Sequence, residues 1–377
     1  MEFVTFSRVF STIQSSGPIL NISEKYKINT RVSLKPYNTF QIEAVASEWT
    51  EIHHSDDLLR LMDSPVFQSG RRYILGGGSN VLFTNDFNGL IIKNAIPGIN
   101  VLSEDEHHVV LKIGAGVLWD NLVRYSLDHN LAGIENLSMI PGLVGAAPIQ
   151  NIGAYGVELE QTFLSLEARN LENGEQVIFD HGMCQFGYRN SIFKQSLKDK
   201  FLITYVTLRL DKQPELTLDY GNLRQTLAAE GVTDPDIHDV SRAVRSIRAS
   251  KLPDPEVTGN AGSFFKNPVI STGYYEKLKT SWPDMPGFPV ISQGRSFNFK
   301  DHGHEEQIKV PAAWLIEQCG FKGKRDGDAG VHDKHALILV NYGNATGQQL
   351  LDLAGSIQDS VKEHFGISLE PEVNIVS

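Results

Sequence analysis

Apolar residues in the first part of the chain recur at spacings typical of one helix and several short strands. Ile52, Leu58, Leu59 and Met62 fall at helical intervals and predict a helix over residues 49–61. Runs of β-branched and aromatic residues predict strands over 73–75, 81–83, 89–94 and 107–116. Only a turn fits between the first two of these strands, so we expect no helix there.

The middle of the chain combines an amphipathic helix, an irregular stretch and further strands. Trp119, Leu122, Val123 and Leu127 share one face of a helix predicted over 117–129. Residues 131–158 are rich in glycine, proline and small side chains, and a long irregular stretch inside a domain is usually functional. Further strands are predicted over 164–168, 176–179 and 202–210.

The last third of the chain begins with a helical pattern over 236–248. The sequence Leu-Pro-Asp-Pro at 252–255 then interrupts regular structure and indicates a domain boundary. Beyond it, helices are predicted over 312–319 and 346–365, and strands over 336–341 and 368–376. Thr346 suits the N-cap of the second helix and Gly366 suits its C-terminal stop.

Composition narrows the class of protein. A chain of 377 residues should form about two to three domains. No apolar run approaches the roughly 18 residues that a membrane-spanning helix needs, and a net charge of −11 argues against a broad nucleic-acid surface. Cys184 and Cys319 are too few for a disulfide framework and fit buried free thiols in a reducing compartment. His332 and His335 lack further ligands, so no metal site is expected.

Residues 1–30 differ from the rest of the chain. They are poor in acidic residues, contain Arg8 and several serines, and lack the compact apolar core of a secretory signal. We expect a disordered extension or a start codon placed too early, in preference to an organelle-targeting peptide. The ordered chain should begin near Val32.

Two glycine-rich stretches are candidate ligand loops. Residues 76–80, Gly-Gly-Gly-Ser-Asn, follow a predicted strand, and their backbone N–H groups could approach a phosphate closely. The loop leads into another strand, unlike a Rossmann fingerprint, and lacks the lysine of a Walker loop. Taken alone, this motif is better explained by a tight turn. Residues 141–156 hold four glycines and three alanines, and together the two stretches favour a dinucleotide lying between them.

Polar residues in three other motifs could carry chemistry, although each also has a structural explanation. Arg189 in GYRNSIFK suits paired recognition of a carboxylate or phosphate, but a surface arginine fits as well. Ser263 lies between a glycine and two phenylalanines, where its hydroxyl could be desolvated or could cap a turn. Glu370 and Glu372 in LEPEV point to one face if that segment is a strand.

In order and spacing these motifs resemble the UDP-N-acetylenolpyruvoylglucosamine reductase family, of the type with an extra tyrosine loop. The similarity runs from about residue 33 to 373, through the blocks IPGLVGAAPIQNIGAYGVEL, FGYRNSIFK, KLPDPEVTGNAGSFFKNP and AAWLIEQCGFKG. The resemblance implies an α+β protein: an FAD-binding fold of the vanillyl-alcohol-oxidase/PCMH type, with two α+β subdomains, and a C-terminal α+β substrate-binding domain. The implied divisions are an extension at 1–30, FAD-binding subdomains at 31–84 and 85–253, a substrate-binding domain at 254–373 and a tail at 374–377.

The resemblance also implies roles for individual residues. Arg189, Ser263 and Glu372 match the family's active-site arginine, serine proton donor and glutamate. Non-covalent FAD would contact Gly76, Gly77, Gly78, Ser79, Asn80, Pro141, Gly142, Gly145, Ala146, Ala147, Asn151, Gly153 and Ala154. The UDP-sugar would contact Tyr188, Tyr220, Lys251, Asn267 and Gln318. Tyr220 matches the tyrosine of the loop that closes over the nucleotide, and Lys251 matches a lysine near the diphosphate.

The implied activity is NADPH-dependent reduction of UDP-N-acetylglucosamine enolpyruvate to UDP-N-acetylmuramate through FAD, in peptidoglycan precursor synthesis. We expect a cytoplasmic monomer that binds small molecules, with no nucleic-acid or membrane partner. This chain departs from the family's pattern at three positions. Ala146 and Ala147 replace serines, so one flavin hydrogen bond is lost or moves to backbone, and Asn374 replaces an arginine.

Two other functions fit parts of the sequence. An FAD oxidase of the same fold would be favoured by a histidine or cysteine for covalent flavin attachment, and neither glycine-rich stretch offers one. A non-catalytic protein that binds a nucleotide sugar would not need Ser263 beside a flavin. A yellow protein whose colour NADPH bleaches would separate the reductase from most alternatives.

Overall fold

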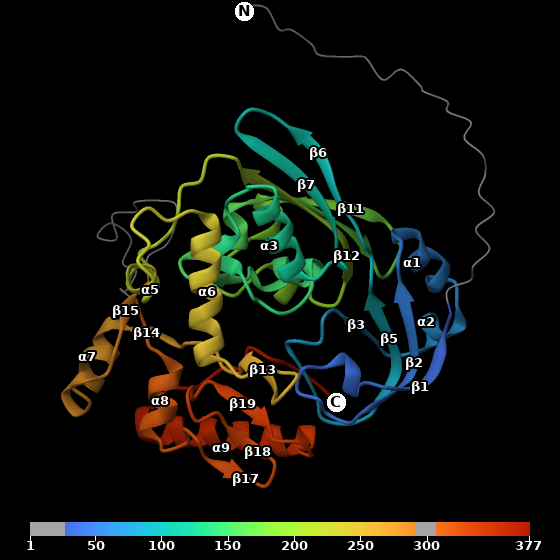
Figure 1. The fold of residues 1–377 in the computed structure, drawn as a ribbon. Coiled ribbons are helices and arrows are strands. Elements are labelled where there is room, and N and C mark those ends of the chain that lie inside the picture. The colour runs from blue at the N-terminus through green and yellow to red at the C-terminus, as the bar shows by residue number, and fades with distance from the viewer. Residues whose placement is uncertain (1–26, 291–306) are drawn as a thin grey trace, which may run out of the picture.

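Four strands from the first quarter of the chain form a sheet in the order β1-β2-β5-β3, in a computed structural model that describes residues 27–290 and 307–377. The strands are β1 (Asn29–Ser33), β2 (Val45–Ile52), β3 (Arg72–Leu75) and β5 (Phe87–Asn94). Helices α1 (Ser55–Met62) and α2 (Pro65–Ser69) lie beside them (Figure 1). β2 and β3 both run parallel to β5.

The first sheet corrects two expectations. The helix predicted over 49–61 is wrong in its first half, because Trp49 and Ile52 are buried in β2 and only the part from Ser55 is helical. The three-residue interval between these two side chains imitates one turn of a helix. β5 belongs to this sheet although it lies beyond the subdomain boundary expected at residue 84.

A second sheet of five antiparallel strands, in the order β11-β10-β12-β7-β6, forms the middle of the molecule. Its strands are β6 (Ile99–Glu104), β7 (His108–Gly114), β10 (Phe163–Asn170), β11 (Gln176–Asp180) and β12 (Phe201–Asp211). The associated helices are α3 (Trp119–Asp128), α4 (His181–Cys184), α5 (Leu223–Ala229) and α6 (Ile237–Lys251). The strands predicted over 107–116, 164–168, 176–179 and 202–210 and the helices predicted over 117–129 and 236–248 are confirmed.

The irregular stretch predicted over 131–158 is also confirmed. It contains a 3₁₀ segment at Val144–Gln150 and a small hairpin of β8 (Gly153–Ala154) and β9 (Val157–Glu158). Asn151 ends the 3₁₀ segment in the left-handed backbone region, at φ 44°. This stretch therefore forms a compact, mainly irregular segment beside the second sheet and contributes little to the sheet itself.

The C-terminal third forms a separate core around the sheet β13-β19-β18-β17. These strands are β13 (Gly259–Ser263), β17 (Arg325–Asp326), β18 (Ala329–Val331) and β19 (Ile338–Asn341), with a smaller sheet of β14 (Val269–Ser271), β15 (Phe288–Pro289) and β16 (Gln307–Lys309). Helices α7 (Thr272–Ser281), α8 (Ala312–Gln318) and α9 (Gly347–Phe365) complete it. Thr346 and Gln349 form a capping box at the start of α9, and Gly366 ends the helix at φ 63°, as predicted.

The C-terminal end of the chain returns to the first part of the molecule. β20 (Asn374–Val376) pairs in parallel with β4 (Val81–Phe83), and Figure 1 shows this end beside the strands of the first sheet. Of the strand predicted over 368–376, only these last residues form a regular strand, while residues 370–372 make a single antiparallel bridge with residues 264–266. Residues 374–376 therefore form a strand paired with β4 and are not the expected tail.

The N-terminal end also differs from expectation. Asn29 and Thr30 belong to β1 and pair with β2, so an extension that reached residue 30 would overlap the first sheet. The features noted in residues 1–26, including Arg8, lie outside the described residues. Both cysteines are free, with Cys184 buried and Cys319 partly exposed. Within the described ranges, no helix is both long and apolar enough to cross a membrane.

Candidate functional site

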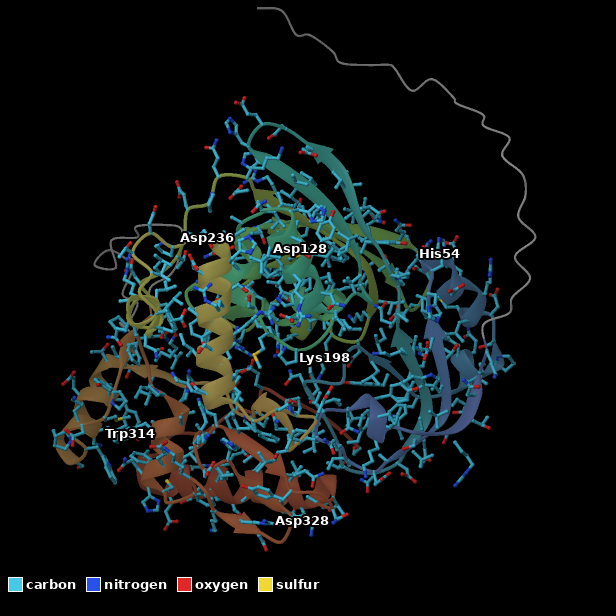
Figure 2. The ribbon with its side chains drawn as sticks, viewed as in Figure 1. His54, Asp128, Lys198, Asp236, Trp314 and Asp328 are labelled. Atoms are coloured by element: carbon cyan, nitrogen blue, oxygen red, sulfur yellow. The ribbon has the colours of Figure 1, made fainter. Side chains whose placement is uncertain are left out.

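A cavity of about 570 Å³ lies where the three regions of the fold meet. Its lining comes mainly from residues 71–81, 143–149, 193–203 and 371–376. Figure 2 labels one lining residue, Lys198, near the middle of the molecule. The volume falls within the roughly 300–1,000 Å³ common for small-molecule sites. Elements distant in sequence must therefore assemble before this site exists.

The loop at 76–80 presents backbone donors to the cavity. The Lys93 ammonium donates a hydrogen bond to the Gly76 carbonyl, and Gly78 adopts φ 66° where a side chain would overlap the Tyr37 carbonyl oxygen. The backbone N–H groups of Gly77, Gly78 and Ser79 donate no hydrogen bond to any described residue. Unpaired N–H groups that line a turn attract anions, so the loop suits a diphosphate.

The two glycine-rich stretches touch through their backbones. A Cβ at Gly77 would lie 2.8 Å from the Gly142 Cα, and a Cβ at Gly145 would lie 2.5 Å from the Ala115 Cβ. Of the residues predicted to contact the cofactor, Gly76, Gly77, Gly78, Ser79, Asn80, Gly145 and Ala146 line the cavity. Pro141, Gly142, Ala147, Asn151, Gly153 and Ala154 are outside the lining. The narrow, donor-rich cradle fits a dinucleotide such as FAD.

Glu372 reaches the cavity because its segment bonds to two distant parts of the chain. The Glu372 N–H donates to the Phe264 carbonyl at 2.7 Å, and the Asn80 side chain donates to the Glu372 carbonyl at 3.1 Å. Asn80 also donates to the Gln150 side chain at 3.2 Å. Both glycine-rich stretches and the C-terminal segment are thus joined at one asparagine.

Arg189 and Glu372 are brought together. Arg189 has a left-handed backbone, φ 52°, in a turn closed by hydrogen bonds between Gly187 and Asn190. Its Nη2 donates to the Gly153 carbonyl at 2.7 Å, and its Nε lies 3.5 Å from the Glu372 Oε1. Both side chains are mostly buried. The structure therefore brings these two predicted site residues together, with Glu372 in the lining of the cavity and Arg189 outside that lining.

The pairing of β13 with β19 is irregular just before Ser263. The register between β13 and β19 shifts between Asn260 and Ser263, and Gly262 takes φ 68°. Bulges change the direction of the side chains that follow them. The next residue, Phe264, accepts the Glu372 N–H, so Ser263 lies one residue from the segment that carries Glu372. The Ser263 hydroxyl has no hydrogen-bond partner among the described residues.

Tyr188 and Asn267 lie side by side between the middle and C-terminal regions. Burial raises the pKa of the Tyr188 phenol, while Arg189 and the hydrogen bond with Asn267 oppose that rise. The Lys309 ammonium is 4.6 Å from the centre of the Tyr188 ring. Asn267 Oδ1 accepts the N–H of Ala312 at 2.9 Å, at the start of α8. The two predicted substrate residues therefore share one local cluster.

The remaining predicted substrate residues are more spread out. Tyr220 is 55% exposed, and its Cβ is 3.3 Å from the place a Cβ would occupy at Gly156. Lys251 is the last residue of α6 and is exposed. Burial lowers the pKa of His335, and the positive charge of Lys251 lowers it further. Gln318 is exposed at the end of α8 and, within the described residues, makes no hydrogen bond with the other predicted site residues.

Several charged residues at the site escaped the sequence-based prediction. Lys194 and Lys266 line the cavity, and burial together with the Lys266 charge lowers the pKa of Lys194. Burial also lowers the pKa of Arg248, whose Nε has no partner among the described residues. Arg248 lies three residues before Lys251 on α6, a spacing that places both on one helix face and could have identified it.

Comparisons with known proteins show which proteins this chain is similar to. Residues 254–376 match the UDP-N-acetylenolpyruvoylglucosamine reductase C-terminal domain, and residues 51–180 match an FAD binding domain. The chain is 44% identical to UDP-N-acetylenolpyruvoylglucosamine reductase from Flavobacterium johnsoniae, over 93% of this chain and 100% of that protein. It is 45% identical to the Pseudomonas aeruginosa protein of that name, over 93% and 99%.

A solved structure supports the same fold. The crystal structure of the enzyme of this name from Thermus caldophilus superposes with a TM-score of 0.62 at 23% identity, and covers 93% of this chain and 100% of that one. The matched lengths are nearly complete, and they include both the glycine-rich loops and the segment that carries Glu372. The chain therefore belongs to the UDP-N-acetylenolpyruvoylglucosamine reductase family.

Proposed function

We propose that this chain reduces UDP-N-acetylglucosamine enolpyruvate to UDP-N-acetylmuramate with NADPH, as a step of peptidoglycan precursor synthesis. The observation that carries the proposal is the Arg189–Glu372 pair, whose nitrogen and oxygen lie 3.5 Å apart beside a cavity with free backbone donors. Membership of the family supplies the substrate class.

The cavity residues would hold FAD, which when bound carries hydride from NADPH to the terminal vinyl carbon of the substrate. Gly77, Gly78 and Ser79 would donate backbone hydrogen bonds to its diphosphate. Ala146 offers no side-chain donor, so any flavin contact there must use backbone. Lys194 and Lys266 also line the cavity and add positive charge, which favours an anionic ligand.

Arg189 would stabilise the charge that develops on the substrate. As hydride reaches the vinyl carbon, the adjacent carbon and its carboxylate become an enolate. A guanidinium donates paired, charge-assisted hydrogen bonds to such an oxyanion. The Glu372 carboxylate lies against the Nε of Arg189. This contact orients the other two nitrogens of the guanidinium. The pair therefore orients the carboxylate and lowers the energy of the enolate.

Ser263 would donate the proton that completes the reaction. Its hydroxyl is uncommitted among the described residues and lies one residue from the contact between Phe264 and Glu372. A serine hydroxyl is a weak acid, but an enolate carbon is a strong base, so transfer to that carbon can run downhill. The resulting C–H bond gives the lactyl ether of the product.

The sugar nucleotide would bind between the middle and C-terminal regions. Tyr188 and Asn267 form one part of this surface, and Tyr220 and Lys251 form the nucleotide part. Gln318 is assigned by family resemblance alone. We place the FAD-binding subdomains within residues 31–253, with β20 added from the C-terminal end, and the substrate-binding domain at 254–373. The proposed enzyme works as a cytoplasmic monomer, where UDP-sugars are available.

Two half-reactions test this function. The purified protein should be yellow, and denaturation should release its flavin. Under anaerobic conditions NADPH should bleach the colour, and the enolpyruvyl UDP-sugar should restore it with formation of UDP-N-acetylmuramate. Colour that only oxygen restores would indicate an oxidase of this fold and would contradict the proposal.

A further inference from the structure

Three polar side chains behind Arg189, those of Asn151, Glu158 and Glu160, take no part in the proposed hydride and proton transfers. Asn151 is fully buried, and its Nδ2 donates to the Glu158 Oε2 at 3.0 Å and to the Glu160 Oε1 at 3.1 Å. Its Oδ1 accepts the Glu160 N–H at 3.1 Å. One buried amide therefore holds two carboxylates close together.

This group is in contact with Arg189. The same Asn151 amide lies 3.3 Å from the carbonyl of Gly187, in the turn that carries Arg189. A Cβ at Gly153 would lie 2.8 Å from the Glu158 Cγ and 3.3 Å from the Arg189 Nη1. Glu158 and Arg189 therefore pack on the same glycine, whose carbonyl accepts the Arg189 Nη2.

Two carboxylates at one donor cannot both ionise without repulsion. Burial, followed by the hydrogen bond and charge of Glu160, raises the pKa of Glu158 to about 7, while Arg189 and Asn151 oppose the rise. The other titratable group at the pair is His181, whose Nε2 lies 3.7 Å from the Glu160 Oε2. Below about pH 7 Glu158 therefore holds a proton while it is bonded to Asn151.

We propose that Glu158 is a positioning residue for Arg189, and that with Asn151 and Glu160 it forms a hydrogen-bonded support behind the guanidinium. The proposal rests on the proposed function, in which Arg189 faces the enolpyruvyl carboxylate. While Glu158 holds its proton it carries no charge, and the guanidinium remains available to Glu372 and substrate. Loss of that proton places a negative charge behind Arg189, which draws the guanidinium back.

Glu158→Gln tests the support because glutamine imitates the protonated acid at every pH. It can accept from Asn151 and donate to Glu160. In the wild-type holoenzyme, flavin reoxidation by the enolpyruvyl substrate should slow by about tenfold as pH rises through neutrality, the scale of a lost protonation state. Glu158→Gln should remove this fall, and Glu158→Ala should slow reoxidation at every pH. Glu43→Gln, at an exposed ion pair with Lys35, should keep the wild-type profile.

A second measurement does not depend on turnover. In holoenzyme labelled with ¹³C at glutamate carboxyls, one resonance should titrate near pH 7, and Glu158→Gln should remove it. A Glu158→Gln profile that matches wild type, or the absence of any such titration, would overturn the positioning role. A wild-type flavin that the enolpyruvyl substrate cannot reoxidise would instead overturn the proposed function, and the two failures are thus distinguished.

Discussion

At the scale of the residue, Ser263 is the most direct test of the chemistry. Its hydroxyl is needed only after substrate has replaced NADPH, so Ser263→Ala should leave flavin bleaching by NADPH close to normal. Reoxidation by the enolpyruvyl substrate should slow by roughly 100-fold, the usual scale for a positioned general acid. Anaerobic stopped-flow absorbance of the flavin measures both steps.

Ser356→Ala, on the exposed face of α9, is a matched control that should change neither step. Equal slowing of both half-reactions in Ser263→Ala would mean that this serine shapes the flavin cavity and does not donate the proton. No slowing of either would move the donor elsewhere, with Glu372 or a bound water next.

Tyr220 and Lys251 should affect binding more than chemistry. Lys251→Ala should raise the KM for the UDP-sugar roughly tenfold, because a charge-assisted hydrogen bond contributes about 1.5 kcal/mol or more. Tyr220→Phe should raise the KM less. The kcat should stay unchanged in both variants, because each loses an interaction that binds substrate and transition state equally. Steady-state kinetics would decide, with Lys277→Ala on α7 as a remote control. An effect confined to flavin reduction by NADPH would contradict the assignment.

Glu158 should make stability depend on pH. Its pKa rises from an ordinary 4.5 to about 7 on folding, so the folded chain holds this proton more tightly than the unfolded chain. That contribution to stability is complete below 4.5 and is lost as pH rises through about 7. The melting temperature of Glu158→Gln relative to that of wild type should therefore rise between about pH 5 and pH 8. Parallel melting curves would contradict the raised pKa.

Residue types alone could not have identified this site. Composition alone favours the interpretation of Arg189 as a surface arginine. Only the order of the family's motifs indicates that it belongs to one site with Glu372. The Arg189–Glu372 contact joins distant parts of the chain. It depends on the bulge at Ser263 and on the bonds of Asn80, neither of which has a periodic signal in sequence. Glu158 was missed because its importance comes from the buried amide beside it.

At the scale of the element, long periodic segments were predictable and short ones were not. Helix α9 was correct at both caps, because Thr346 and Gly366 are strong local signals. Strands of two or three residues, such as β17 and β18, are too short to show alternation. The strand predicted over 368–376 was correct only at 374–376, since residues 370–372 make a single bridge with the segment after β13 and no longer ladder.

Two glycines of α9 give a matched pair of predictions. A Cβ at Gly347 would overlap the Phe83 carbonyl oxygen of β4, whereas a Cβ at Gly355 meets nothing within 4 Å. Gly347→Ala should therefore destabilise the protein by roughly 1–3 kcal/mol through a forced backbone shift. Gly355→Ala should stabilise it by roughly 0.5–1 kcal/mol, because alanine restricts the unfolded chain. Chemical denaturation would measure both, and equal effects would contradict the tight helix–strand contact.

At the scale of the whole molecule, the two ends of the chain should differ in importance. Removal of residues 374–377 deletes β20 and the bonds from Asn374 to the Asn80 carbonyl, so FAD should bind more weakly and the melting temperature should fall. Removal of residues 1–26 should change neither, because the family resemblance begins near residue 33. Flavin fluorescence titration and thermal melting would compare the truncations. An intact FAD affinity after the C-terminal deletion would show that β4 holds the loop unaided.

The pairing of β20 with β4 also has a consequence during protein synthesis. The loop at 76–80 leaves the ribosome early, but Asn374 and its strand are made much later. Until residues 374–376 have emerged from the exit tunnel, the cofactor cradle lacks one wall. Nascent chains should therefore capture flavin only once these residues are exposed, and a ribosome that still holds them inside the tunnel should carry a folded first sheet but no bound FAD.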